Sequence, residues 1–200
     1  MFIKKMKISR CGQAEIFSDD QRIRIRKSYS NSMHRLIFDI ACFTGERWGA
    51  ILQLRVTDCY HNIRSHEVRD TILFRGCTRK RSAGRAGVTR EVPLHSTLRE
   101  ILRAYSPPHG NLLFPSPRDR ERPISFQSAD RAFRNALDRC GLSERGFSTH
   151  STRRTFITRL SERGTDVRTI QAITGHRSMG SVQRYIEVNK DRISSAIENL

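Results

Sequence analysis

Five side chains that could act on a phosphodiester occur in three short segments of the sequence. Arg47 lies in TGERWGAILQLR, His150 and Arg153 lie in HSTRRTFITRL, and His176 and Tyr185 lie in TGHRSMGSVQRYIEV. Guanidinium groups can stabilise negative charge that builds up on phosphate oxygens, imidazoles can transfer protons, and a phenol can be a nucleophile. Together these residue types indicate attack by a tyrosine on a phosphorus atom.

Each of these residues also has an ordinary structural interpretation. Tyr185 could be a packing residue in a helix, His176 could be a satisfied structural group, and the arginines could pair with acids. The order and spacing of the residues favour a common site instead. His150 and Arg153 are three residues apart and would share one helix face. Arg153 precedes His176 by 23 residues (176−153=23), and His176 precedes Tyr185 by nine (185−176=9).

The order Arg, Lys, His-x-x-Arg, Gly-His, Tyr resembles the tyrosine recombinase family, which includes phage integrases and bacterial chromosome-dimer resolvases. Thr44-Gly45-Glu46-Arg47 is similar to the first box of the family, His150-Ser151-Thr152-Arg153-Arg154 to its His-x-x-Arg box, and Gly175-His176 with Tyr185 to its last box. The resemblance extends over residues 18–190. In its compactness the chain resembles the short integrases that consist of the catalytic domain alone.

The resemblance implies a site-specific DNA recombinase. Tyr185 would form a 3′-phosphotyrosyl ester, Arg47 and Arg153 would clamp the phosphate, His150 would accept or share the phenolic proton, and His176 would hydrogen-bond the phosphate. Because the ester retains the energy of the broken bond, no ATP, metal or other cofactor is expected. The implied partners are double-stranded DNA and further copies of the chain, four on two duplexes. Accessory proteins are left open.

The leaving 5′-oxygen needs an acid, which in the family is a lysine on a β-hairpin. Lys80 is the only lysine between positions 27 and 190 and lies at the start of a predicted hairpin turn. The pKa of a lysine can fall to a useful value, whereas that of an arginine cannot. Lys80 could instead be a solvated turn charge, and Arg79 or Arg81 could occupy the family position.

Two further positions depart from the family pattern. Glu46 precedes Arg47 where an apolar residue is more usual, and it could pair with that arginine. Thr152 stands where leucine or a similar residue is common.

The charge of the chain supports a nucleic-acid partner. Lys and Arg total 37 against 20 acids, a formal net charge of +17. Six of these cations are lysines, which leaves 31 arginines (37−6=31), and the planar guanidinium fork suits phosphate. A ribosomal or membrane-surface protein is the alternative that charge alone leaves open. The candidate DNA-contacting residues are Arg75, Arg79, Arg81, Arg85 and Arg154.

Apolar spacing, caps and helix breakers predict a mainly helical α+β fold with a small antiparallel sheet. The predicted strands are Asp70–Cys77 and Val88–Leu94, with irregular chain before the first of them. The predicted helices are 18–27, 32–44, 48–54, 96–105, 125–139, 150–163, 166–173, 179–188 and 190–199.

The predicted organisation is a basic arm (1–17), a catalytic domain (18–189) and a C-terminal tail helix (190–200). The tail, with apolar Ile193, Ala196, Ile197 and Leu200, could pack on its own domain or dock on a neighbouring protomer. Two other functions are kept open, a type IB topoisomerase-like relaxing enzyme and a catalytically silent DNA-binding accessory protein.

The sequence also bears on location. The five cysteines are scattered, without a CxxC pair, which favours reduced thiols and disfavours a zinc site. No apolar run approaches the length of a membrane span, and the basic start lacks the apolar region of a secretory signal. A cytoplasmic, DNA-associated protein of bacterial or phage origin is expected. The DNA target and the direction of the reaction are not readable from the sequence.

Overall fold

Helices predominate in the protein, whose computed structural model describes residues 14–78, 88–176, 178–183, 185 and 198. The α-helices are α1 (Asp19–Lys27), α2 (Ser32–Thr44), α3 (Trp48–Ile51), α4 (Ser96–Ala104), α5 (Phe126–Arg139), α6 (Thr149–Glu162), α7 (Val167–Thr174) and α8 (Met179–Gln183). The strands are β1 (Tyr60–Asn62), β2 (Glu67–Val68), β3 (Thr71–Phe74) and β4 (Arg90–Pro93), and 3-10 turns cover Val56–Asp58 and Gly76–Thr78. The predicted α+β, mainly α fold is confirmed.

Local capping explains why the helices begin and end where they do. Ser18 begins α1 with a capping box that includes Gln21, and Ser148 begins α6 with one that includes Ser151. These side chains satisfy backbone N–H groups that have no partner within the helix. The αL glycine Gly45 ends α2, as Gly175 ends α7. The caps at Gly45, Ser148 and Gly175 therefore set where the helices beside the candidate catalytic residues begin or end.

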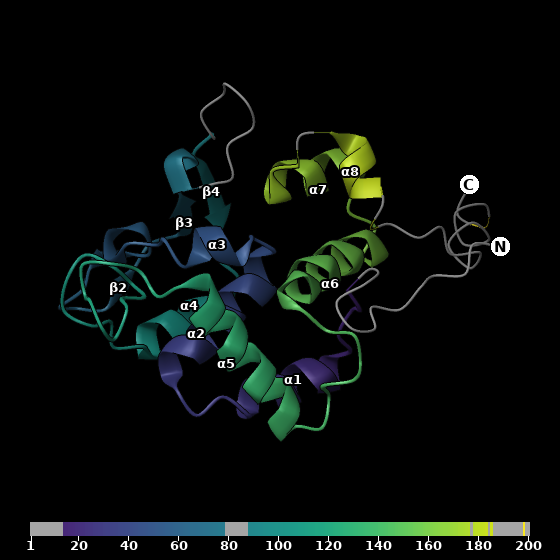
Figure 1. Ribbon diagram of the computed structural model, residues 1–200. Helices are drawn as coiled ribbons and strands as arrows, with labels where there is room; N and C mark the ends of the chain where they lie inside the picture. The colour runs from purple at the N-terminus through teal and green to yellow at the C-terminus, as the bar shows by residue number, and fades with distance from the viewer. Residues whose placement is uncertain (1–13, 79–87, 177, 184, 186–197, 199–200) are drawn as a thin grey trace.

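The main core surrounds α2, which contacts α3, α4, α5 and α6 (Figure 1). Its centre is aromatic: the rings of Phe38 and Phe133 stack with centroids 6.1 Å apart, and the ring of Phe17 meets both edge-on. None of the helices in the described part of the chain has the length and apolar character needed to cross a bilayer.

A second, smaller apolar cluster joins α6, α7 and α8. Ile157, Ile170 and Val182 are fully buried in it, and the ring of Tyr185 packs against them. Figure 1 shows α7 and α8 lying over α6, with the β3–β4 pair and α3 beside them. Tyr185 lies in a turn after α8, so the predicted 179–188 helix is confirmed only as far as Gln183.

The strands differ from the prediction in two respects. β3 and β4 pair antiparallel, with Ile72 opposite Val92, as predicted, but β3 ends at Phe74 because the chain turns into a 3-10 helix at Gly76. The β1–β2 pair was not predicted. Its strands are two and three residues long, and the turn between them contains His66 with a φ of 51°, so no alternating pattern could develop.

The end of the predicted basic arm belongs to the folded domain. Ala14 and Phe17 are buried, and the Glu15 backbone N–H donates to the Gly146 carbonyl. The Arg154 guanidinium donates to the Ala14 carbonyl at 2.5 Å. The domain therefore begins before residue 18, and residues 1–13 of the arm lie outside the described residues.

Candidate active site

The turn between α2 and α3 presents Arg47 at the surface. The Thr44 hydroxyl donates to the Ile40 carbonyl and accepts the Glu46 backbone N–H, which fixes the turn. Gly45 has a φ of 61°, and a Cβ there would lie 2.4 Å from the Phe156 ring, so only glycine fits. Arg47 then occupies the N-cap of α3 and is exposed.

Glu46 is buried and makes an ion pair that the sequence did not reveal. Its Oε2 pairs with the Arg90 guanidinium from β4, and its Oε1 accepts the Arg47 backbone N–H at 2.8 Å. Only 1% of the Glu46 side chain and 11% of the Arg90 side chain are exposed. The contact of Glu46 with Arg47, which the sequence suggested as a pairing, is thus made to the Arg47 backbone. The ion pair of Glu46 with Arg90 connects β4 to the turn that presents Arg47.

Helix α6 carries His150 and Arg153, and the Arg153 side chain is buried. One guanidinium nitrogen donates to the Gly45 carbonyl at 2.8 Å, and the other to the Thr174 carbonyl at 3.0 Å. Burial, together with nearby Arg47, lowers the pKa of Arg153 to about 10, while Glu46 and Tyr185 oppose the shift. The Arg153 guanidinium therefore remains a cation at neutral pH and lies near Tyr185, the candidate nucleophile.

Gly175 ends α7 in the left-handed conformation and turns the chain so that His176 points back toward α6. The Arg153 guanidinium lies 3.0 Å from Nε2 of His176. The His176 ring is in turn 5.7 Å from the Tyr185 ring, centroid to centroid. The Thr158 hydroxyl of α6 donates to the Tyr185 carbonyl at 3.3 Å, which ties the tyrosine segment to the same helix.

A pocket of about 370 Å³ brings Arg47, His150 and Arg153 together. Its wall includes Trp48, whose indole N–H donates to the Thr152 hydroxyl of α6 at 3.2 Å. Thr152, flagged above as a departure from the family pattern, therefore connects α6 to the start of α3. The five residues identified from spacing converge, since His176 adjoins Arg153 and Tyr185 adjoins His176.

The remaining predicted site residues are Lys80 and the candidate DNA-contacting arginines. Lys80, Arg79, Arg81 and Arg85 lie outside the described residues. The Arg75 guanidinium binds the buried Asp58 carboxylate at 2.6 Å, and its DNA contact stays a prediction. Arg154 is buried and its guanidinium donates to the Ala14 carbonyl, and its DNA contact also stays a prediction.

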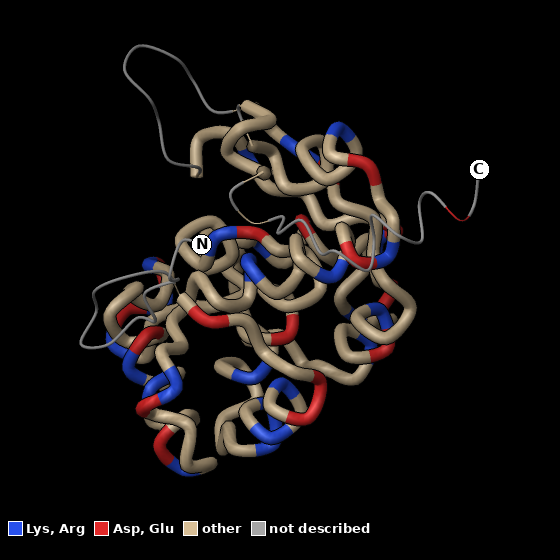
Figure 2. Tube along the Cα trace, turned by 90° about the vertical axis from the view of Figure 1, so that its right-hand side faces the viewer, with Lys and Arg blue, Asp and Glu red and all other residues tan. Residues whose placement is uncertain are grey.

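The surroundings of the site hold residues that sequence reasoning missed. Thr174 accepts a hydrogen bond from Arg153, and Arg90 pairs with Glu46 beside Arg47, yet neither residue stands out among so many arginines and threonines. Figure 2 shows Lys and Arg interspersed with Asp and Glu over the described chain, so charge alone could not have found Arg90.

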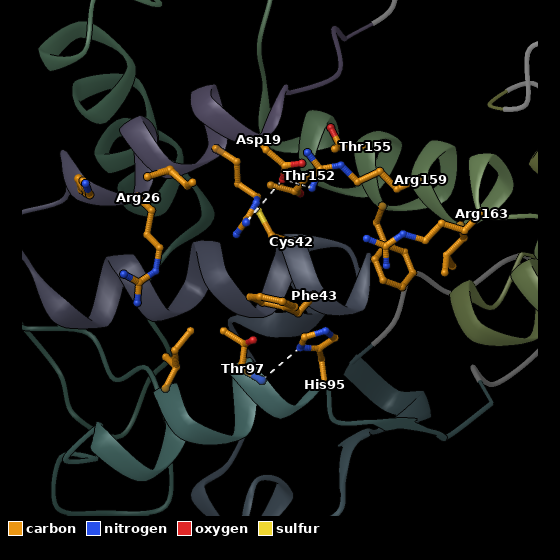
Figure 3. Close-up of a pocket in the computed structure, with 16 residues that line it drawn as sticks. Asp19, Arg26, Cys42, Phe43, His95, Thr97, Thr152, Thr155, Arg159 and Arg163 are labelled. Atoms are coloured by element: carbon orange, nitrogen blue, oxygen red, sulfur yellow. Dashed lines mark hydrogen bonds and ion pairs between the residues drawn. The ribbon is translucent and has the colours of Figure 1, made fainter.

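A second pocket, of about 570 Å³, adjoins α6 on the side of Thr155, Phe156 and Arg159, among α1, α2 and α4 (Figure 3). Phe43 lies on its floor between the Arg22 guanidinium and the His95 ring. Of the described residues, the cations that line it are Arg22, Arg26, Lys27, Arg159 and Arg163, and the acid is Asp19.

Comparisons with known proteins agree with this geometry. The profile of the phage integrase family matches residues 19–192. Tyrosine recombinase XerD of Corynebacterium glutamicum is 31% identical over 121 residues, 56% of this chain and 39% of the relative. Tyrosine recombinase XerA of Thermococcus onnurineus is 26% identical over 168 residues, 82% of this chain and 54% of the relative. The chain thus spans well under two thirds of these relatives.

Solved structures share the fold. A XerA recombinase crystal structure matches with a TM-score of 0.71 at 21% identity, over 94% of this chain and 66% of that chain. The structure of a lambda integrase dimer bound to a COC′ core site matches with a TM-score of 0.66 at 22% identity, over 88% of this chain and 49% of that chain.

The buried Glu46–Arg90 pair gives a stability prediction. Glu46→Gln removes the charge and leaves Arg90 buried without its counter-ion, which typically costs about 3 kcal/mol of unfolding free energy. Asp130→Asn is the matched control, because the Arg134–Asp130 pair on α5 is more exposed and should cost about 0.5 kcal/mol or less. Urea denaturation measures both. Equal losses in the two variants would contradict a structural role for the buried pair.

Proposed function

Because the chain belongs to the phage integrase family, we propose that it is a site-specific DNA recombinase with Tyr185 as its nucleophile. The observation that carries the proposal is the convergence of Arg153, His176 and Tyr185 beside the pocket of Arg47 and His150. Residues from three separate segments meet there, and a packing role for each would not require that they meet.

In the proposed reaction the Tyr185 phenolic oxygen attacks the phosphorus of a DNA phosphodiester. The bond from phosphorus to the 5′-oxygen breaks, and a 3′-phosphotyrosyl ester forms. Arg47 and Arg153 bind the non-bridging oxygens and stabilise the charge of the transition state. The cation of Arg153 is already held by two carbonyls, so little reorganisation is needed when the phosphate arrives.

Two proton transfers complete the step. His150 accepts the phenolic proton as the phosphorus–oxygen bond forms, because the phenol must lose this proton to become an ester oxygen. Lys80 donates a proton to the leaving 5′-oxygen, which becomes a hydroxyl. Ligation is the reverse reaction with a 5′-hydroxyl from the partner strand, and it needs no ATP because the ester retains the bond energy.

We also propose that recombination proceeds in an assembly of four protomers on two duplexes. A related lambda integrase is a dimer on its core site. The C-terminal tail, residues 190–200, is proposed to dock on a neighbouring protomer through Ile193, Ile197 and Leu200. The pocket of Figure 3 is the proposed acceptor, since it has an apolar floor and a cationic rim that suits the acids Asp191 and Glu198 of the tail.

Tyr185→Phe tests the nucleophile. The variant should retain DNA binding but lose covalent attachment to a nicked suicide substrate by about 10⁴-fold or more, because no oxygen remains to attack. Denaturing gel electrophoresis of labelled DNA measures the attachment. Attachment that persists would exclude Tyr185, and a wild-type chain that binds DNA without attaching would favour the accessory-protein alternative.

Lys80→Ala tests the general acid. Cleavage of ordinary DNA should fall by about 10²- to 10⁴-fold, the usual worth of a positioned acid. A substrate with a bridging 5′-phosphorothiolate should restore cleavage, because its sulfur leaves without a proton. Arg79→Ala and Arg81→Ala serve as controls. Rescue of either control in place of Lys80→Ala would reassign the acid.

Ile197→Glu tests the tail. The substitution should preserve binding to a single DNA site and reduce the two-duplex complex by about tenfold or more, because a charge would enter an apolar contact. Ser195→Glu adds the same charge on the opposite face of the predicted tail helix and should assemble normally. Analytical ultracentrifugation of DNA complexes distinguishes them, and normal assembly of Ile197→Glu would exclude this contact.

A further inference from the structure

The hydroxyl of Thr174 holds the imidazole of His176. Thr174 is the last residue of α7 and is fully buried, and its Oγ1 lies 2.6 Å from Nδ1 of His176. The same oxygen lies 2.6 Å from the Ile170 carbonyl, one turn back in the helix. The hydroxyl thus stands between a carbonyl and an imidazole nitrogen.

The positions of the protons follow from these two contacts. A carbonyl oxygen can only accept, so the single hydroxyl proton of Thr174 is donated to Ile170. The Thr174 oxygen must then accept from Nδ1, which means that Nδ1 of His176 carries a proton. The neutral ring is consequently the Nδ1–H tautomer, with Nε2 as its unprotonated nitrogen.

Arg153 does not determine the tautomer. Its Nη2 lies 3.0 Å from Nε2 and 3.2 Å from Nδ1 of His176. A nitrogen in the ring plane could not be nearly equidistant from both without overlapping the ring carbons, so Nη2 lies over the face of the imidazole. The same Nη2 donates to the Thr174 carbonyl at 3.0 Å. Thr174 therefore holds the arginine with its carbonyl and the histidine with its hydroxyl.

We infer that Thr174 is a positioning residue for strand cleavage, which commits Nδ1 of His176 to α7 and so presents Nε2 to the phosphate that Arg153 binds. This inference rests on the proposed function. When the phosphate is bound, its negative charge favours the imidazolium, so the ring takes up a second proton from water at Nε2. Nε2–H then donates to a phosphate oxygen, while Nδ1–H continues to donate to Thr174. A ring without this anchor could rotate and offer either nitrogen.

The alternative is a purely structural hydroxyl. Threonines near helix ends often donate to the carbonyl one turn back, and Thr44 does so at the end of α2 with an oxygen–oxygen distance of 2.7 Å. A structural role would affect folding but would leave the tautomer of His176 unchanged. The tautomer is therefore the measurement that separates the two interpretations.

The test uses the full chain and two substitutions. Thr174→Val keeps the shape and removes the hydroxyl, and Thr174→Ser keeps the hydroxyl. Long-range proton–nitrogen NMR spectra, assigned by comparison with His176→Gln, report which ring nitrogen carries the proton. Cleavage of a suicide substrate and DNA affinity are measured in parallel.

We expect the Nδ1–H tautomer in the wild-type chain and in Thr174→Ser, and a mixture or the Nε2–H tautomer in Thr174→Val. Thr174→Val should cleave about 10- to 100-fold more slowly, the usual cost of losing a partner that orients a histidine, with unchanged DNA affinity. Thr174→Ser should restore most of the rate.

Three results would overturn the inference: an Nε2–H tautomer in the wild-type chain, a wild-type tautomer in Thr174→Val, or an altered tautomer with an unaltered rate. The first of these needs no variant to fold. If the wild-type chain does not cleave DNA at all, the proposed function fails, and the spectra still decide whether Thr174 sets the tautomer.

Discussion

The buried guanidinium of Arg153 is the interaction on which the site depends. It donates to the Gly45 carbonyl at the end of α2 and to the Thr174 carbonyl at the end of α7. A helix C-terminus carries partial negative charge and carbonyls without partners in the helix. One cation therefore satisfies two helix ends and fixes the segments that follow them, which carry Arg47 and His176. The cost of burying the charge is visible in the lowered pKa of Arg153.

The ends of α2 and α7 share one local arrangement of a threonine and a glycine, but the threonine hydroxyl contacts a different group at each. Thr44-Gly45 and Thr174-Gly175 each combine a threonine that donates one turn back with a left-handed glycine. At the first, the threonine oxygen accepts a backbone N–H and shapes the turn before Arg47. At the second, it lies against the imidazole of the next residue but one. The residue two positions after the threonine is Glu46 at the first helix end and His176 at the second. The same cap therefore shapes a turn at the end of α2 and contacts a candidate catalytic group at the end of α7.

Much of the fold could be predicted because helix signals are local. Caps such as Ser18 and Ser148, and the glycines after α2 and α7, set the boundaries without reference to the rest of the chain. The candidate site was found from the spacing of five residues. What could not be predicted depends on contacts between distant segments: the Glu46–Arg90 pair joins residues 44 positions apart, and the carbonyls that bind Arg153 have no sequence signature. The hydrogen bond from Arg154 to the Ala14 carbonyl could not be predicted for the same reason, because the two residues are 140 positions apart.

The small apolar cluster of α6, α7 and α8, against which Tyr185 packs, is separate from the main core of the domain. Among the described residues, those fully buried in it are Ile157, Ile170 and Val182, and none of them belongs to the main core. Regions with few buried apolar contacts open at lower free energy than the core. In the proposed reaction the tyrosine must engage and release DNA repeatedly, and a rearrangement confined to the small cluster would leave the aromatic centre around Phe38 packed.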